Sequence, residues 1–223
     1  MNDTQKRFKL LPEMEGPQAR WYARLRGTEP QLEANRVQAA QLTADLPDGT
    51  DILEIAPGPG YHAVELAKLG RFTVTGLDIS RTMVDIATEY AKRSGVTVDF
   101  RRGDATNLPF EAGSFDLIVC QAAFKNFVEP VRAINEIHRV LRNGGTAVIQ
   151  DMSGEATNSA IDHEVLTMNV NRVNAFMTKV ALLGLRRRAF SPARFKDLAA
   201  QSTFGACTVS AEGIGLEVRL RKA

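Results

Sequence analysis

Asp51-Ile-Leu-Glu-Ile-Ala-Pro-Gly-Pro-Gly60 is the stretch that decides the fold, and Asp78 follows it eighteen residues later. An apolar strand leads into this Gly-rich turn and an amphipathic helix leaves it. A second apolar strand, Phe72 to Leu77, then runs up to the acid. A βαβ unit of this kind binds nucleosides, because the turn lets a ligand come close and the acid accepts hydrogen bonds from ribose hydroxyls.

The chemistry of the turn narrows the choice of nucleoside. It does not follow the G-x-G-x-x-G pattern, and Pro57 and Pro59 have no N–H groups. A pyrophosphate cradle depends on backbone N–H donors at the start of a helix, so the turn is poorly suited to NAD or ATP. A ligand with an adenosine and an amino acid but no phosphate fits it better.

Five short motifs in this order resemble those of class I S-adenosylmethionine-dependent methyltransferases, over roughly residues 48–151. Glu54 to Gly60 is similar to their acid-x-G-x-G-x-G motif. The others are the ribose-binding acid Asp78, the adenine element Gly103-Asp104-Ala105, the fourth strand Phe115 to Cys120, and the turn Arg139 to Gly145. Phe124-Lys-Asn-Phe127 stands where ubiquinone/menaquinone-type C-methyltransferases carry a similar stretch.

The chain departs from this pattern at two positions. Ala56 replaces the first glycine of the motif, so that residue needs a negative φ or must tolerate a methyl group against the ligand. Asn143 stands where the family usually has proline. Neither change removes a functional group.

Strand and helix patterns alternate through the middle of the chain, which predicts a doubly wound, parallel α/β sheet. We expect strands near 51–56, 72–77, 97–101, 115–121 and 146–151, with Gly144-Gly145 as a tight turn before the last of them. We expect helices near 60–69, 81–93 and 130–141. The alternation over Ala206–Ser210 and Leu216–Leu220 predicts an antiparallel hairpin over 204–223 that closes the sheet. The resemblance implies seven strands in all, with helices on both faces and helical lid elements.

At 223 residues, the chain is expected to form a single domain. Residues 1–46 are predicted to hold a loose arm over 1–16 and two helices, 18–26 and 30–46, which form a lid. Residues 47–151 form the cofactor-binding core. Residues 152–203 are a helical insertion on the acceptor side, with one helical pattern over 158–183 and another from Ser191-Pro192.

The resemblance implies a set of cofactor-binding residues. These are Tyr22, Glu54, Ala56, Pro57, Gly58, Gly60, Asp78, Ile79, Met83, Asp104, Ala105 and Gln121. Asp78 would take the ribose hydroxyls, Asp104 and Ala105 the adenine, and Ile79 and Met83 its faces. Simpler roles stay open: a helix cap for Asp78, a structural acid for Glu54, a turn former for Asp104, and core positions for Ile79 and Met83.

Acceptor residues are harder to find, because an activated methyl group needs little acid–base chemistry beyond positioning and exclusion of water. Trp21, Phe124 and Phe127 are predicted to wall a substrate pocket. The catalytic residues stay unknown, and the candidates that could orient or deprotonate an acceptor are Asp151, His163 and Lys125. Ordinary roles remain open here too, including a docked amino-terminal helix and a solvated Lys125.

Composition limits the function classes. With 28 basic and 26 acidic residues the formal charge is +2, which gives no general case for a polyanionic partner, and Arg186-Arg187-Arg188 is interpreted as a solvated helix end. Two cysteines in apolar contexts, no metal-ligand spacing, no signal-peptide pattern and no long apolar run predict a soluble, cytoplasmic, metal-free protein. A homodimer is kept as a separate hypothesis.

Together these observations predict an enzyme that transfers a methyl group from S-adenosylmethionine to a small, partly apolar molecule by in-line displacement. S-adenosylhomocysteine would be the product. The alternatives are a nucleic-acid-modifying methyltransferase, and a non-catalytic protein that binds S-adenosylmethionine.

Overall fold

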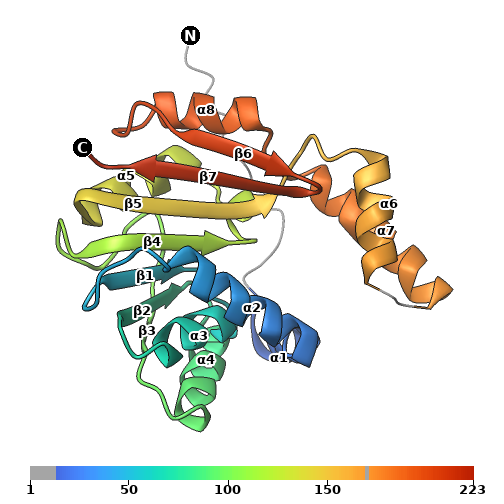
Figure 1. Cartoon of the computed structure of the whole chain (residues 1–223), viewed down its shortest axis with the longest axis horizontal. Helices are drawn as coiled ribbons and strands as arrows, with labels where there is room; N and C mark the ends of the chain where they lie inside the picture. The colour runs from blue at the N-terminus through green and yellow to red at the C-terminus, as the bar shows by residue number, and fades with distance from the viewer. Residues whose placement is uncertain (1–13, 169–170) are drawn as a thin grey trace.

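A seven-stranded sheet in the order β3-β2-β1-β4-β5-β7-β6 runs through the protein (Figure 1). The computed structural model describes residues 14–168 and 171–223. The strands are β1 Asp51–Ile55, β2 Thr73–Asp78, β3 Asp99–Arg102, β4 Phe115–Gln121, β5 Leu141–Met152, β6 Thr208–Glu212 and β7 Gly215–Arg221. The first five are parallel, whereas β7 runs antiparallel to both β5 and β6. The predicted fold class is confirmed.

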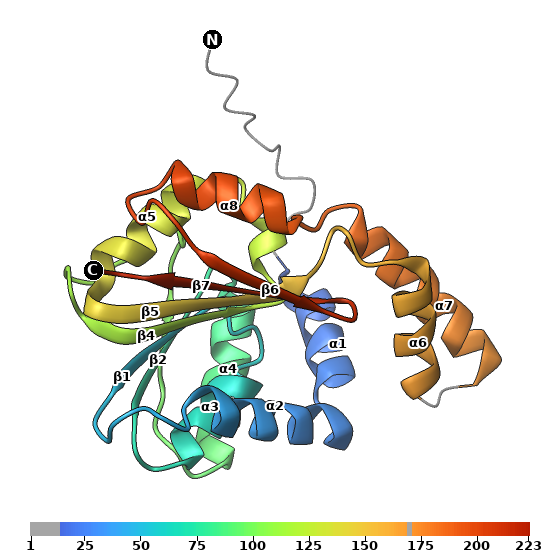
Figure 2. The same cartoon turned by 45° about the horizontal axis from the view of Figure 1, so that its top comes forward.

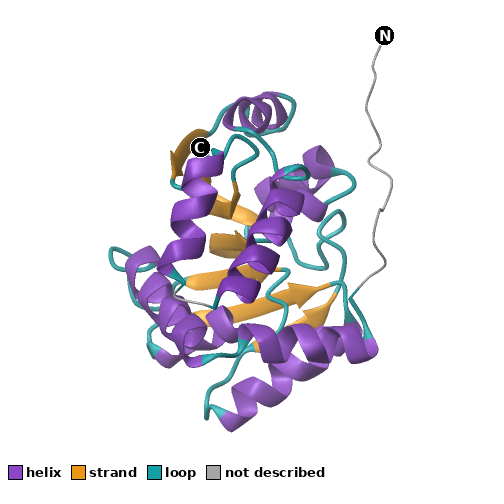
Figure 3. Ribbon diagram, turned by 90° about the vertical axis from the view of Figure 1, so that its right-hand side faces the viewer, coloured by secondary structure: helices purple, strands orange, loops and turns teal. Residues whose placement is uncertain are grey.

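Helices cover both faces of this sheet (Figure 3). They are α1 Gly16–Arg26, α2 Glu29–Leu42, α3 Tyr61–Lys68, α4 Arg81–Arg93, α5 Pro130–Val140, α6 Asn158–Thr167, α7 Arg172–Arg186 and α8 Pro192–Ala200, with the 3-10 turn η1 Phe124–Asn126. Helices α2 and α3 pack on one face, and α5 and α8 on the other. None of these helices is long and apolar enough to cross a membrane.

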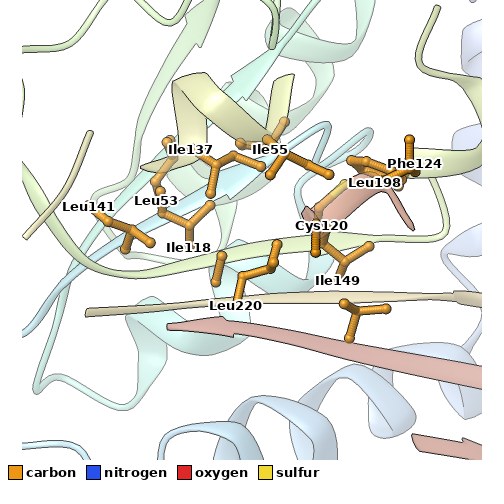
Figure 4. Close-up of a cluster of buried hydrophobic side chains, with 14 of the residues drawn as sticks. Leu53, Ile55, Ile118, Cys120, Phe124, Ile137, Leu141, Ile149, Leu198 and Leu220 are labelled. Carbon is orange, nitrogen blue, oxygen red and sulfur yellow. The ribbon is translucent and has the colours of Figure 1, made fainter. Parts of the chain in front are cut away.

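The alternation of side chains along the strands explains the two layers of helices. Leu53 and Ile55 of β1 belong to the cluster that contains α5 and α8, whereas Ile52 between them packs with α2 and α3. Figure 4 shows the first cluster, in which side chains from β1, β4, β5 and β7 meet those from α5 and α8. Because successive residues of a strand point to opposite faces, a strand that is apolar throughout requires cover on both.

The predicted turn at Gly144-Gly145 is wrong, because β5 already begins at Leu141 and both glycines lie within it. The pairing with β4 shifts in register between Phe115 and Leu117, so this start of the strand is a bulge. Gly144 has a φ of 81°, and its N–H donates to the carbonyl of Lys222. A Cβ on Gly145 would lie 2.9 Å from the carbonyl oxygen of Asp116, so the bulge needs both glycines.

Two predicted helices have different limits in the structure. The helical pattern over 158–183 forms two helices, α6 and α7, and these make a hairpin that projects from the body of the molecule (Figure 2). Helix α2 ends at Leu42, and the Thr43 hydroxyl donates back to the carbonyl of Ala39. The predicted loose arm falls on residues 1–16, and its first thirteen residues lie outside the described range.

Candidate cofactor and active site

The Gly-rich turn after β1 is fastened to the acid at the tip of β2. The Gly58 N–H donates to Oδ2 of Asp78 over 3.0 Å, and the Ser80 N–H donates to Oδ1 over 2.9 Å. The Asp78 side chain is largely buried, and this burial raises the pKa of its carboxyl group, while the two N–H donors oppose the rise. Since each carboxylate oxygen has two lone pairs, both oxygens keep capacity for a hydroxyl donor.

The two glycines of the turn face different surroundings, although both have positive φ angles, 56° for Gly58 and 78° for Gly60. A Cβ on Gly60 would lie 2.7 Å from Ala87 and from Phe100, so this glycine allows α3, α4 and β3 to pack together. A Cβ on Gly58 would meet no atom within 4 Å. Open space therefore lies beside Gly58, where a ligand would approach the backbone.

Ala56 lies at the tip of β1 with a φ of 56°, so the first of its two predicted alternatives, a negative φ, is wrong. Its N–H donates to the carbonyl of Leu77, which ties the tip of β1 to β2. Ala122 follows the neighbouring strand β4 and also has a positive φ, 53°. Strained non-glycine residues of this kind are concentrated at functional sites, and no motif in the sequence pointed to Ala122.

Beneath the turn, Glu54 and His62 are both almost fully buried. Oε2 of Glu54 lies 3.4 Å from Nδ1 of His62. Neither this oxygen nor either ring nitrogen of His62 has a hydrogen-bond partner among the described residues. Buried polar atoms normally find partners, so these unmet groups under the turn are a place where a ligand or water would bind.

The predicted adenine residues lie at the neighbouring strand tip. The N–H of Gly103 donates to the carbonyl of Asp78, which places Asp104 beside the acid of β2. Oδ1 of Asp104 accepts the N–H of Thr106, and Ala105 lies half-buried between them. The two predicted adenine neighbours differ in exposure, because Ile79 is exposed and Met83 is buried.

The start of α1 is bound to the start of α4. The Glu15 carboxylate accepts the N–H groups of Arg81 and Thr82, and these bonds with the Thr82 hydroxyl lower its pKa to about 2. Ser80 donates to the carbonyl of Met14 and also caps α4 by accepting from Met83.

The other end of α1 is held by Tyr61, whose hydroxyl donates to the carbonyl of Ala23 over 2.8 Å. Between the two anchors, Tyr22 is half-buried and Trp21 is 63% exposed. The amino-terminal helix is therefore docked beside the turn, with Trp21 directed to solvent.

The predicted pocket residues after β4 lie in the core. Phe124 is fully buried, and its ring lies 4.9 Å from Phe127, 5.2 Å from Phe195 and 5.7 Å from Phe190, between ring centroids. Phe127 is half-buried at the edge of this aromatic group. Of the two predicted pocket residues, Phe127 is therefore the more accessible.

Lys125 and Asp151 form a buried ion pair, with Nζ 2.8 Å from Oδ1, so the interpretation of Lys125 as a solvated charge is wrong. Lys125 also donates through Nζ to the carbonyl of Ala122, and its backbone N–H donates to Oδ2 of Asp151. The pair thus fastens the loop after β4 to the end of β5. A lysine this well paired is unsuited to the role of a base.

The two remaining predicted residues lie apart. Gln121 donates to Gln150, which also accepts from Gln38 of α2 and donates to Glu217 of β7, so a polar network joins three strands and a helix. His163 is exposed on α6, on the side of the helix opposite the buried Ile161 and Val165. No described contact brings His163 to the strand tips.

Comparison with known proteins places this arrangement in a family. Residues 53–149 match the family model described as a methyltransferase domain. Over this core the chain is similar to class I S-adenosylmethionine-dependent methyltransferases. Demethylmenaquinone methyltransferase of Deinococcus radiodurans is 32% identical over 123 residues, 55% of this chain and 50% of that protein. The chain spans about half the length of the first curated relatives it matches.

Two solved structures resemble the methyltransferase fold of this chain. A SAM dependent methyltransferase from Aquifex aeolicus has a TM-score of 0.67 at 16% identity, and the match covers 90% of this chain and 96% of that one. The [4+2]-cyclase SpnF has a TM-score of 0.53 at 30% identity, over 59% of this chain and 49% of that one. The second likeness is a reminder that one fold hosts several chemistries.

S-adenosylmethionine is the cofactor of this family, and the residues at the strand tips fit it. The open space beside Gly58 accepts a ligand against the backbone, and the prolines on either side offer no N–H groups to a phosphate. The unmet Glu54 oxygen beneath the turn suits a cationic or hydrogen-bonding group. Three independent features of the site thus agree on a nucleoside that carries an amino acid.

Proposed function

We propose that this methyltransferase acts on a small, partly apolar acceptor. The observation that carries the cofactor part of the proposal is the Asp78 carboxylate, which accepts from the Gly58 N–H at a strand tip while its oxygens keep capacity for hydroxyl donors. The likeness to demethylmenaquinone methyltransferase over the core supports an apolar, ring-containing acceptor. The role of each site residue below belongs to the same proposal.

Cofactor binding would use the elements that surround the turn. Asp78 would accept the ribose hydroxyls, Asp104 and the Ala105 N–H would bind the adenine, and Ile79 would cover one face of the ring. Gly58 would lie against the methionine portion, above Glu54. When bound, S-adenosylmethionine supplies a sulfonium methyl group that is already a strong electrophile.

The protein would then act mainly by positioning and by excluding water. Tyr22 on α1 and Phe127 after β4 are both half-buried, and in this proposal both would border the acceptor. The Lys125–Asp151 pair would keep the loop after β4 in place. This chain would therefore orient the acceptor rather than provide a strong base.

Similarity to the [4+2]-cyclase SpnF raises a second candidate, in which the same fold binds S-adenosylmethionine but promotes a reaction other than methyl transfer. The two are distinguished by whether the methyl group leaves. A nucleic-acid acceptor would instead show binding that weakens steeply with salt.

The test combines binding with turnover. Calorimetry should show micromolar affinity for S-adenosylhomocysteine and none for NAD, and a screen of phenols, amines and quinols with labelled methyl should give a labelled product. Equal affinity for NAD would refute the cofactor assignment. Tight binding of S-adenosylhomocysteine with no labelled product across the panel would favour the second candidate.

A further inference from the structure

The outer face of α7 carries apolar side chains that the protein leaves uncovered. Val173 is 71% exposed, Phe176 66%, Met177 61% and Val180 49%. Their spacing of three and four residues places all four on one side of the helix, and we call them the α7 stripe. No residue of α7 is buried.

The stripe points away from the rest of the molecule. Helix α7 turns its opposite side, with the half-buried Ala175, Thr178 and Leu182, to α6 and the body. Lys179 forms an ion pair with Asp162 of α6, which fixes the rotation of α7 about its axis. The hairpin projects from the body (Figure 2), so the stripe is presented at a free edge of the molecule.

The charge of the surrounding segment indicates what covers the stripe. Between Glu164 and Asp197 the sequence has no acidic residue and seven cations. These are Arg172, Lys179, Arg186, Arg187, Arg188, Arg194 and Lys196. The whole chain has a net charge of only +2, so positive charge is concentrated on α7 and on the segment that continues into α8, whereas α6 carries Asp162 and Glu164.

A basic hollow of about 480 Å³ lies at the base of α7, next to the stripe. It is lined by Gly154, Phe190, Ser191 and three arginines, Arg186, Arg187 and Arg194. Arg186 is held in position because it donates to the carbonyl of Ala156 and to Oδ1 of Asn158. The hollow therefore offers a preformed set of donors for an anionic group at one end of an apolar stripe.

From this juxtaposition we propose that the α7 stripe and the basic hollow dock on the surface of a membrane that contains anionic phospholipids. The apolar side chains enter the boundary between headgroups and acyl chains, and the hollow takes a phosphate headgroup. A second copy of the chain is a poor occupant, because two such hairpins would bring Arg172 and Arg187 of each into like-charge contact. The proposal is independent of the reaction catalysed.

Vesicle flotation tests the proposal with the full chain. The protein should float with vesicles of phosphatidylcholine and phosphatidylglycerol, should not float with phosphatidylcholine alone, and should be released by salt. The double variant Phe176→Ser/Met177→Ser should weaken binding by about tenfold or more, and Arg187→Glu should also weaken it. All these side chains are exposed, so the fold should survive, which calorimetry with S-adenosylhomocysteine checks.

Matched controls distinguish binding through the α7 stripe from non-specific binding to vesicles. Val37→Ser replaces a 46% exposed apolar residue on α2, and Lys92→Glu reverses an exposed charge on α4, so both should float as the wild type does. Absence of flotation at low salt would overturn the proposal, and so would an equal loss in the controls. A dimer that the stripe variant dissociates would assign the stripe to a second copy instead.

Discussion

The loops after the neighbouring strands β1 and β4 are both held in place at the edge of the sheet, but by different kinds of interaction. The loop after β1 is held by the Gly58 N–H, which donates to the Asp78 carboxylate, and it leaves open space beside Gly58. The loop after β4 is held by side chains, with Phe124 in the core and Lys125 paired to Asp151. A loop held by its backbone needs glycines and prolines at set positions. A loop held by side chains can be built from many different sequences. Only the loop after β1 therefore has a motif that can be recognised in the sequence.

The largest expected effect concerns the loop after β4, which the Lys125–Asp151 pair holds in place. Asp151→Ala leaves the Lys125 ammonium buried without its carboxylate, and breaking a buried pair in this way should cost about 3–5 kcal/mol of unfolding free energy. Urea unfolding measures the loss. The double variant Lys125→Met/Asp151→Asn removes both charges of the pair and should recover most of the lost stability. Equal losses in both variants would mean that the loop is held elsewhere.

In the loop after β1, substitutions of the two glycines should affect different properties. Gly60 should matter for the stability of the fold and Gly58 for cofactor binding. Gly60→Ala combines a clash with Ala87 and Phe100 with a positive φ, so it should cost about 2–4 kcal/mol of unfolding free energy. Gly58→Ala meets open space and should cost only about 1 kcal/mol through its φ, yet it should weaken S-adenosylhomocysteine binding. Thermal unfolding and calorimetry of both variants give the comparison, and identical profiles would contradict it.

Asp78→Ala should weaken cofactor binding by about 1.5–3 kcal/mol, because charge-assisted hydrogen bonds to the ribose are lost. The variant also leaves the Gly58 and Ser80 N–H groups without their acceptor, so some loss of stability should accompany it. Asp78→Asn keeps the size of the side chain and serves as the control. Unchanged affinity in the alanine variant would leave Asp78 as a support of the turn alone.

A smaller effect is expected at Ala56. Its φ of 56° is costly for alanine and free for glycine, so Ala56→Gly should stabilise the fold by about 0.5–1 kcal/mol. Chemical denaturation detects a change of this size. Destabilisation would show that the methyl group of Ala56 packs usefully against the aromatic core.

The smallest effect is local and depends on pH. Because the hydrogen bonds at Glu15 lower its pKa from 4.5 to about 2, the docking of α1 should be complete above pH 4.5 and weaken as the pH falls toward 2. The emission of Trp21, the single tryptophan, reports this change on α1 itself. Glu15→Gln should remove the dependence over this range. A transition that persists in the variant would assign it to another group.

The sequence predicted the sheet well because its central strands, such as β1 and β4, are largely apolar on both faces and its turns contain glycine. It misplaced the start of β5, because a bulge with Gly144 and Gly145 has the same composition as a turn. The burial of Lys125 was also not predicted, because its partner Asp151 lies twenty-six positions away in the chain and no local pattern connects the two residues. The contrast between Gly58 and Gly60 depends on Ala87 and Phe100, which meet the turn only in three dimensions.

The pairing of β5 has a consequence for how the chain is made. On one side β5 pairs with β4, which has already been synthesised, but on the other it pairs with β7 along seven residues from Thr146 to Met152. Strand β7 leaves the ribosome only after α6, α7 and α8. During that interval the nascent chain exposes an apolar strand edge, which is a site for misassociation. Slow translation of α6 and α7, or a chaperone that shields this edge, should therefore change the yield of folded protein.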